Sequence, residues 1–92
     1  MIKTWANAAT RRFFETGKSR FSGLDSDAAI ELMTALDEAA ALGELSPLKS
    51  IGLHKLKGDR KGQWAMTING PWRLVFRFRD GNAEDVEIVD YH

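Results

Sequence analysis

The chain contains only two histidines, His54 and His92, and imidazole is the side chain best suited to proton transfer near neutral pH. His54 opens a cationic stretch that runs to Gly62, and His92 directly follows Asp90 and Tyr91. A lone histidine is more often a surface or capping residue, and chain ends usually fray. Two conditions favour a catalytic role: a last strand held in a sheet would fix His92, and pairing of that strand at the sheet centre would bring the basic stretch near both histidines.

The chemistry that suits these residues is RNA cleavage without a metal. A base takes the proton of the ribose 2′-OH as it attacks the neighbouring phosphate, and an acid protonates the departing 5′ oxygen. Arginine and lysine would stabilise the extra charge, and the 2′-OH requirement selects RNA over DNA. No glycine-rich segment has Walker spacing, no His or acidic cluster has metal-ligand spacing, and cysteine is absent. We expect no cofactor and no metal.

The formal net charge of zero conceals a strong segregation along the chain. Residues 1–45 carry five basic and seven acidic groups, residues 46–79 carry eight basic and one acidic, and residues 80–92 carry five acidic groups and no Lys or Arg. A basic segment of this kind often marks a polyanion-binding surface. The alternative is a structural charge match between a basic strand and the acidic last strand, in which each exposed pair contributes little.

Length and composition indicate one small domain that spans residues 1–92. With 43% hydrophobic residues and 10% aromatic residues, the chain has enough apolar material for one core. No apolar run approaches the length of a membrane span, and the N-terminus lacks the apolar stretch of a signal peptide. We therefore expect a soluble, cytoplasmic protein.

The first half of the chain predicts a short strand followed by a helix. Residues 2–5 are β-prone, Asn7 is a good N-cap, and Gly17 is a good helix stop. Residues 8–16 should therefore form a helix, with Phe13 and Phe14 turned inward.

A second, longer helix is expected after a connecting loop. Asp25 or Ser26 would cap it, and apolar residues follow at helical spacing. Gly43 is expected to close this helix, and Pro47 prevents any continuation.

The second half changes to a period of two, which is typical of strands. Residues 64–68 and 72–79 place large apolar side chains at even positions, and turns are expected at 69–71 and 80–82 before a last strand. One sheet face should pack on the helices while the other presents Arg73, Arg77 and Arg79. The predicted class is α+β, with both helices on one face of the sheet.

Several segments together resemble the HigB-type branch of the RelE/ParE toxin superfamily. They are Leu53–Trp64 (LHKLKGDRKGQW), Trp72–Leu74 (WRL) and Glu87–His92 (EIVDYH), with support from Met1–Lys3 and from Phe14–Gly17 (FETG). The resemblance spans essentially the whole chain. The pattern LKGDRxGxW with a closing DYH is specific only in combination.

The resemblance implies a RelE-like (microbial RNase-like) fold, in which an N-terminal strand and two helices pack on one face of a small, mostly antiparallel sheet. It also implies a toxin of a bacterial type II toxin–antitoxin system. Such toxins enter the A site of the 70S ribosome, against 16S rRNA, and cut translated mRNA without a metal. The implied partner is a HigA-like helix-turn-helix antitoxin, and the complex would bind operator DNA.

The family's site residues carry over onto matching positions of this chain. The resemblance implies His92 as the main acid or base, with His54 and Tyr91 as its partners, while Asp90 orients an imidazole. Lys57 and Arg73 would stabilise the transition state. Which histidine gives the proton and which takes it stays open. General attraction of the RNA backbone is expected from the other basic residues of the middle segment: Lys55, Arg60, Lys61, Arg77 and Arg79.

Two other functions remain open at this point. The ParE branch shares the fold and inhibits DNA gyrase without catalysis, but it lacks the paired histidines and the closing Asp-Tyr-His pattern. A plain RNA-binding module could use the arginines with Trp64 or Trp72. The apolar period places both tryptophans on the core face, which argues against base stacking.

Overall fold

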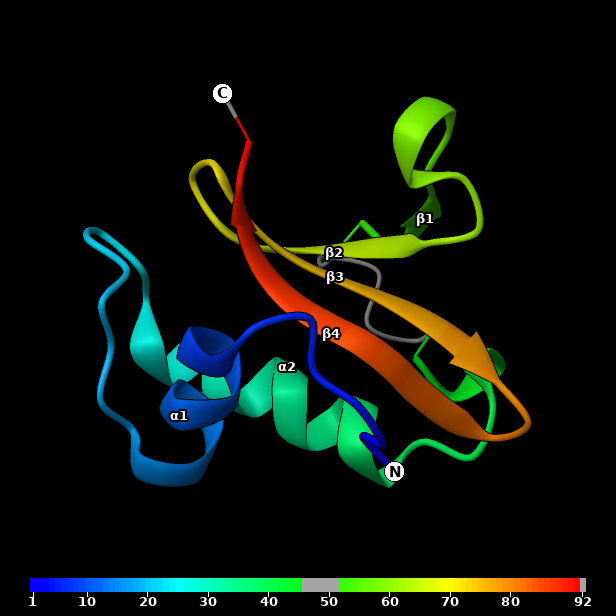
Figure 1. Cartoon of the computed structure of the whole chain (residues 1–92), viewed down its shortest axis with the longest axis horizontal. Coiled ribbons are helices and arrows are strands. Elements are labelled where there is room, and N and C mark those ends of the chain that lie inside the picture. The colour runs from blue at the N-terminus through cyan, green and yellow to red at the C-terminus, as the bar shows by residue number, and fades with distance from the viewer. Residues whose placement is uncertain (46–51, 92) are drawn as a thin grey trace.

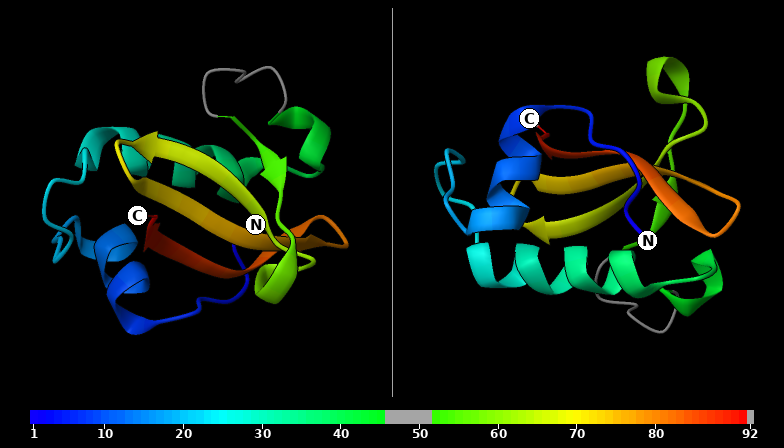
Figure 2. Two further views of the ribbon diagram at one scale, coloured as in Figure 1. Left: turned by 90° about the horizontal axis from the view of Figure 1, so that it is seen from above. Right: turned by 60° about the horizontal axis from the view of Figure 1, so that its bottom comes forward.

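The computed structural model describes residues 1–45 and 52–91, which form two helices against one face of a four-stranded antiparallel sheet (Figure 1). The sheet order is β1-β2-β3-β4, and both views of Figure 2 place the two helices on the same side of it. The predicted α+β class is confirmed. The elements in chain order are α1 (Ala8–Thr16), α2 (Ser26–Glu38), the 3₁₀ turn η1 (Leu42–Glu44), β1 (His54–Lys55), the 3₁₀ turn η3 (Gly58–Arg60), β2 (Trp64–Asn69), β3 (Trp72–Arg79) and β4 (Asn82–Asp90).

Side-chain caps set the helix boundaries that the sequence predicted. The Asn7 side chain accepts a hydrogen bond from the Thr10 N–H at 2.9 Å, and Gly17 ends α1 in the left-handed region at φ +76°. Asp25 rather than Ser26 is the N-cap of α2, since its carboxylate accepts the Ala28 N–H at 3.1 Å. In the described ranges, no helix is long and apolar enough to cross a membrane.

The second helix ends earlier than predicted, at Glu38 instead of Gly43. The chain becomes extended at Ala39. The Glu44 carboxylate then accepts hydrogen bonds from the backbone N–H groups of Ala40 and Ala41. These bonds compete with continuation of the helix. The η1 turn then brings Leu45 into the core, where 1% of its surface stays exposed. Pro47, predicted to stop the helix, lies outside the described residues.

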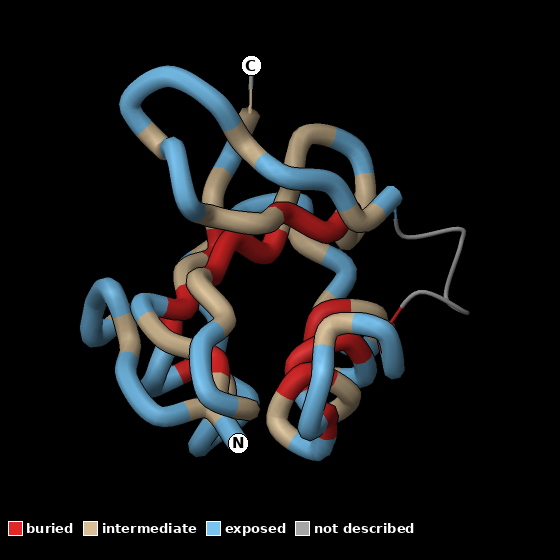
Figure 3. Tube along the Cα trace, turned by 90° about the vertical axis from the view of Figure 1, so that its right-hand side faces the viewer, coloured by how far each residue is buried: buried red, intermediate tan, exposed pale blue. Residues whose placement is uncertain are grey.

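The core lies between the helices and the inner face of the sheet. Figure 3 shows the buried stretches of the helices and strands turned toward one another. Phe13 and Met33 from the helices and Met66, Leu74 and Phe76 from the strands are all fully buried. The even positions of β2 and β3 therefore face the helices, as their alternation predicted.

The N-terminal segment pairs with the last strand, although it is not a continuous strand as predicted. Ile2 and Trp5 form isolated parallel bridges with Ala83 and Val86. Asp85, whose φ is +51°, lies between these two bridges, where the register of β4 with β3 also shifts. Strand β4 is thus held from both sides, but it is the last strand in the sheet order. Pairing at the centre of the sheet, which would have brought both histidines near the basic stretch, does not occur.

Candidate active site

The candidate site is the sheet face that points away from the helices. His54, Ala65, Val75 and Glu87 are successive partners across the four strands, so their side chains share this face. Ala65 and Val75 are fully buried, yet they lie outside the core cluster that packs on the helices. Other side chains must therefore cover the middle of this open face.

Arg60 supplies part of that cover. It lies in η3, between β1 and β2, and its Nη1 donates to Glu87 Oε1 on β4 at 3.3 Å and to Gln63 Oε1 at 3.2 Å. The bond to Glu87 places the Arg60 guanidinium on the open face beside the partner of Val75. Arg60 therefore ties the η3 segment, which we take as residues 56–63, to β4, and its guanidinium is already engaged with a carboxylate.

The arginines of β3 that were expected to face RNA also meet the acidic strand. Arg77 Nε lies 3.5 Å from Asp85 Oδ2, and Arg79 Nη2 lies 3.0 Å from Glu84 Oε1. The structural charge match that the sequence left open is thus present on this face. Because such exposed pairs are weak, they leave the guanidinium groups able to exchange partners.

Glycine at position 62 allows Arg77 to lie against the backbone of the η3 segment. Arg77 Nη1 donates to the Lys61 carbonyl at 3.4 Å. A Cβ at Gly62 would stand 2.7 Å from that nitrogen, and its φ of +92° is strained for any other residue.

Three lysines remain as the cations around a hollow beside β1. Lys55, Lys57 and Lys61 line it with Leu56 and Gly58, and its volume is about 380 Å³. All three lysines are exposed, and none joins an ion pair within residues 1–45 and 52–91. This hollow is therefore the electropositive part of the candidate site.

A hydrogen bond fixes the tautomer of His54 at the edge of the same segment. His54 Nδ1 lies 2.8 Å from the Gly52 carbonyl oxygen. Because a carbonyl only accepts, Nδ1 must donate, which leaves Nε2 to accept a proton or, in the charged ring, to donate one. The exposed imidazole is thus oriented for proton transfer to or from a bound molecule.

A second group of predicted site residues gathers at the turn between β2 and β3. Arg73 Nη1 donates to the Gly70 carbonyl at 2.6 Å and to the Trp72 carbonyl at 3.0 Å. The Tyr91 N–H donates to the Pro71 carbonyl at 2.8 Å, so the same turn holds the end of the described chain. Exposed Asp90 pairs with Trp72 across the strands, and His92 lies outside the described residues.

The sheet register keeps His54 apart from this second group. His54 lies on β1 and Asp90 on β4, three strands away. Glu87 is the β4 residue opposite His54 across the sheet, and Asp90 lies three residues beyond it along the strand. With strands spaced about 4.8 Å apart and a rise of about 3.3 Å per residue, the two Cα atoms are about 17 Å apart on an untwisted sheet. The structure therefore joins Arg73, Asp90 and Tyr91, and it places His54 with the lysines.

Comparison with known proteins identifies the family. The protein-family model described as "RelE-like toxin of type II toxin-antitoxin system HigB" matches residues 3–92 of this chain. The chain belongs to this HigB-like toxin family. An Endoribonuclease HigB from Proteus vulgaris is 37% identical over 93 aligned positions, which cover 100% of both chains. The resemblance inferred from the basic segment and the closing Asp-Tyr-His is confirmed, and membership in this family implies an antitoxin partner.

The HigB-like chain offers no tryptophan platform for bases on the open face. Trp72 Nε1 donates to the Ser22 carbonyl at 3.2 Å, and its ring packs on Phe21 at a centroid distance of 5.5 Å. Trp64 packs against the core cluster. Both observations confirm the prediction that the alternation of the strands places the two tryptophans on the core face. In the same described ranges, no group of three or more His, Cys, Asp or Glu could hold a metal ion.

Glu87 and Gln63 are residues of this face that the sequence did not single out. Both accept a hydrogen bond from Arg60. The alternation around Ile88 could have placed Glu87 on the open face. Its pairing with Arg60 could not be inferred, because these residues are 27 positions apart and meet only through the sheet register.

Proposed function

We propose that this HigB-like chain is a ribosome-dependent endoribonuclease that cleaves translated mRNA in the A site without a metal. The observation that carries the proposal is its full-length likeness, at 37% identity, to a protein named Endoribonuclease HigB. The open face supports it. An oriented imidazole and three lysines without an ion-pair partner among the described residues suit RNA better than an uncharged ligand.

In this reaction the 2′-OH of one ribose attacks the phosphorus of the phosphate on its 3′ side. A general base takes the hydroxyl proton, the bond to the 5′ oxygen of the next nucleotide breaks, and a general acid protonates that oxygen. The products are a 2′,3′-cyclic phosphate and a free 5′-OH. His92 acts as the main acid or base, with His54 and Tyr91 as partners and Asp90 orienting an imidazole.

Two cations stabilise the charge that develops on the phosphate. Nη1 holds Arg73 at the β2–β3 turn, and the planar guanidinium carries further N–H donors. Lys57 projects from the η3 segment, which Arg60 holds on the sheet. The sheet register keeps the two groups apart: the Cα atoms of His54 and Asp90 are about 17 Å apart. Arg73 shares the open face with His54, whereas Asp90 shares the face of its partner Trp72 at the end of the sheet.

The partners proposed for this chain are a 70S ribosome carrying mRNA and a HigA-like helix-turn-helix antitoxin. The toxin and antitoxin together would bind operator DNA, and the toxin would act in the cytoplasm. The neighbouring reading frame should therefore encode a small helix-turn-helix protein.

The experiment that tests the proposal maps the 5′ ends of mRNA fragments on translating ribosomes. The wild-type chain should generate new ends in the A site, and His92→Ala should abolish them while the circular dichroism spectrum is unchanged. Glu31→Gln, an exposed change on α2, is the matched control and should cut like the wild type. Cutting by His92→Ala would refute the role of His92. Inhibition of gyrase supercoiling without any cutting would establish the ParE-like alternative.

A further inference from the structure

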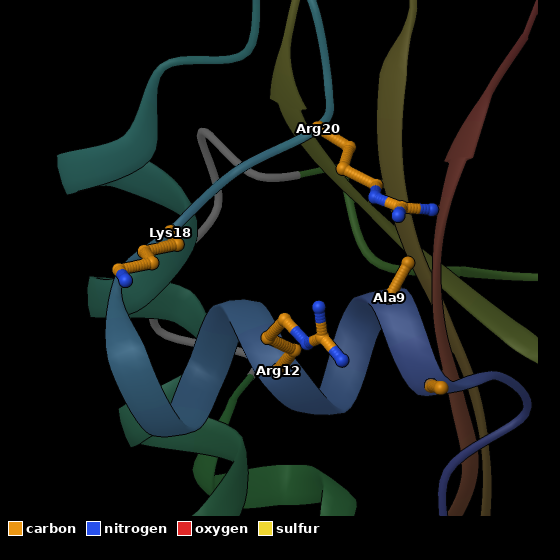
Figure 4. Close-up of a pocket in the computed structure, with 5 residues that line it drawn as sticks. Ala9, Arg12, Lys18 and Arg20 are labelled. Carbon is orange, nitrogen blue, oxygen red and sulfur yellow. The ribbon is translucent and has the colours of Figure 1, made fainter.

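A second basic hollow lies on α1, away from the lysines of the open face. Arg12, Lys18 and Arg20 line it together with Ala8 and Ala9, and its volume is about 80 Å³. Figure 4 shows the Arg12 side chain rising from α1 and the Arg20 side chain reaching from the loop, with Ala9 between their guanidinium ends. A space of this volume holds several water molecules, which is room for one phosphate group.

The cations around this α1 hollow have no acidic partner among the residues that the structure describes. All three cations are exposed, and none of them joins an ion pair within the described ranges 1–45 and 52–91. On the same helix, Arg11 forms an ion pair with Glu15 at 3.0 Å. Glu15 therefore neutralises the charge of Arg11 and not that of the neighbouring Arg12. Like charges that share one hollow repel each other, and a bound anion would remove that cost.

The loop that carries Arg20 is fixed to the turn that holds Arg73 and Tyr91. Trp72 Nε1 donates to the Ser22 carbonyl, and the Asn69 side chain donates to the Gly23 carbonyl at 3.0 Å. The loop that carries Arg20 therefore lies at the end of the sheet where β4 finishes, while α1 packs on the helix side of the sheet (Figure 1). An RNA strand that leaves the open face past this turn reaches the hollow by passing around that end of the sheet.

We propose that the α1 hollow binds one backbone phosphate of the RNA that runs out of the candidate active site. This inference rests on the proposed function. Two guanidinium groups can each offer paired N–H donors to phosphate oxygens, which single lysines cannot. The contact reads no base, so it fixes the position of the strand and carries no sequence preference.

The test compares two double variants of equal net charge. Arg12→Gln/Arg20→Gln removes two cations of the α1 hollow, and Lys3→Gln/Arg11→Gln removes two cations elsewhere on the N-terminal segment and α1. Binding of a short 2′-O-methyl RNA, which cannot be cut, is measured by fluorescence anisotropy over a range of salt concentrations. The first variant should bind about tenfold more weakly at low salt, with a salt slope about 0.7 smaller in magnitude for one lost phosphate contact. The control should bind like the wild type.

Equal affinities and slopes for the two variants would overturn the α1 phosphate site, and wild-type mRNA cutting on ribosomes would still uphold the proposed function. Failure of the wild-type chain to bind the RNA would overturn the α1 phosphate site alone. Failure to cut mRNA on ribosomes would overturn the proposed function and with it this inference. A poly-glutamate peptide serves as a second probe. If Arg12→Gln/Arg20→Gln loses peptide binding and keeps RNA binding, the hollow is a site for an acidic protein segment and the phosphate assignment is wrong.

Discussion

The ion pair between Arg60 and Glu87 is expected to stabilise the protein and to hold the η3 segment in place. Glu87→Gln removes the carboxylate charge and keeps a side chain of the same size. Arg60 would then keep its hydrogen bond to Gln63, and its link to β4 would lose the attraction between opposite charges. The segment that carries Lys57 and Lys61 should become less strongly fixed to the sheet.

The magnitude follows from the distance and the exposure of the pair. At 3.3 Å and an effective dielectric constant of about 20, two unit charges attract each other by about 5 kcal/mol. Lost hydration offsets most of this, and the side chains still keep 34% and 27% of their surface exposed. Because glutamine also retains an acceptor oxygen, we expect a net loss of about 1 kcal/mol in the free energy of unfolding. For a domain of this size that lowers Tm by roughly 4–8 °C.

Asp85→Asn is the matched control, because it removes the same charge from the same strand. Its pair with Arg77 is longer, at 3.5 Å, and the two side chains are 43% and 52% exposed. Asparagine also tolerates the positive φ of this position. The expected loss is below about 0.5 kcal/mol. Urea unfolding gives both values, and amide hydrogen exchange over residues 56–63 reports how firmly the η3 segment is held.

Arg60→Ala extends the series, because it removes the bonds to both Glu87 and Gln63 together with a half-buried side chain. It should cost more than Glu87→Gln, about 2 kcal/mol in total. Equal unfolding free energies for Glu87→Gln and Asp85→Asn, with unchanged exchange over residues 56–63, would refute the proposed role of Arg60 and Glu87. The burial of Val75 would then depend on other side chains.

Three further changes test the framework that carries the site. Gly62→Ala should destabilise the fold by roughly 1–3 kcal/mol, because the φ of this position is +92° and the new Cβ would meet Arg77. Gly43→Ala is the control, because the space around Gly43 is open, and its free energy of unfolding in urea should be nearly unchanged. Thr10→Val should cost about 2 kcal/mol, because the buried hydroxyl accepts a β4 amide N–H at 3.1 Å, and Thr10→Ser should recover part of that loss. Asn7→Ala should lower the unfolding free energy by about 1 kcal/mol through loss of the α1 cap, and an unchanged Tm would show that the cap contributes nothing.

The sequence by itself determined the family, the starts of both helices, the end of α1 and the two long strands β2 and β3. Local signals act over a few residues, so Asn7, Gly17 and the alternation of β2 and β3 could be read directly, and the structure confirms them. The end of α2 could not be read in this way. It depends on the hydrogen bond that the Glu44 carboxylate accepts from the Ala41 N–H and on the burial of Leu45 in the core.

Only the tertiary structure decided which charges meet. The sequence showed a basic segment and an acidic last strand. Whether the basic side chains face RNA or the acidic strand depends on the sheet register. The register pairs Arg60 with Glu87, Arg77 with Asp85 and Arg79 with Glu84. The same register separates His54 from Asp90 and gathers Arg73 with Tyr91. Pairing between strands is a contact between distant residues, and a shift of one residue would turn every side chain to the other face. The sequence identified the basic residues of the site, and only the fold shows which of them have no ion-pair partner among residues 1–45 and 52–91.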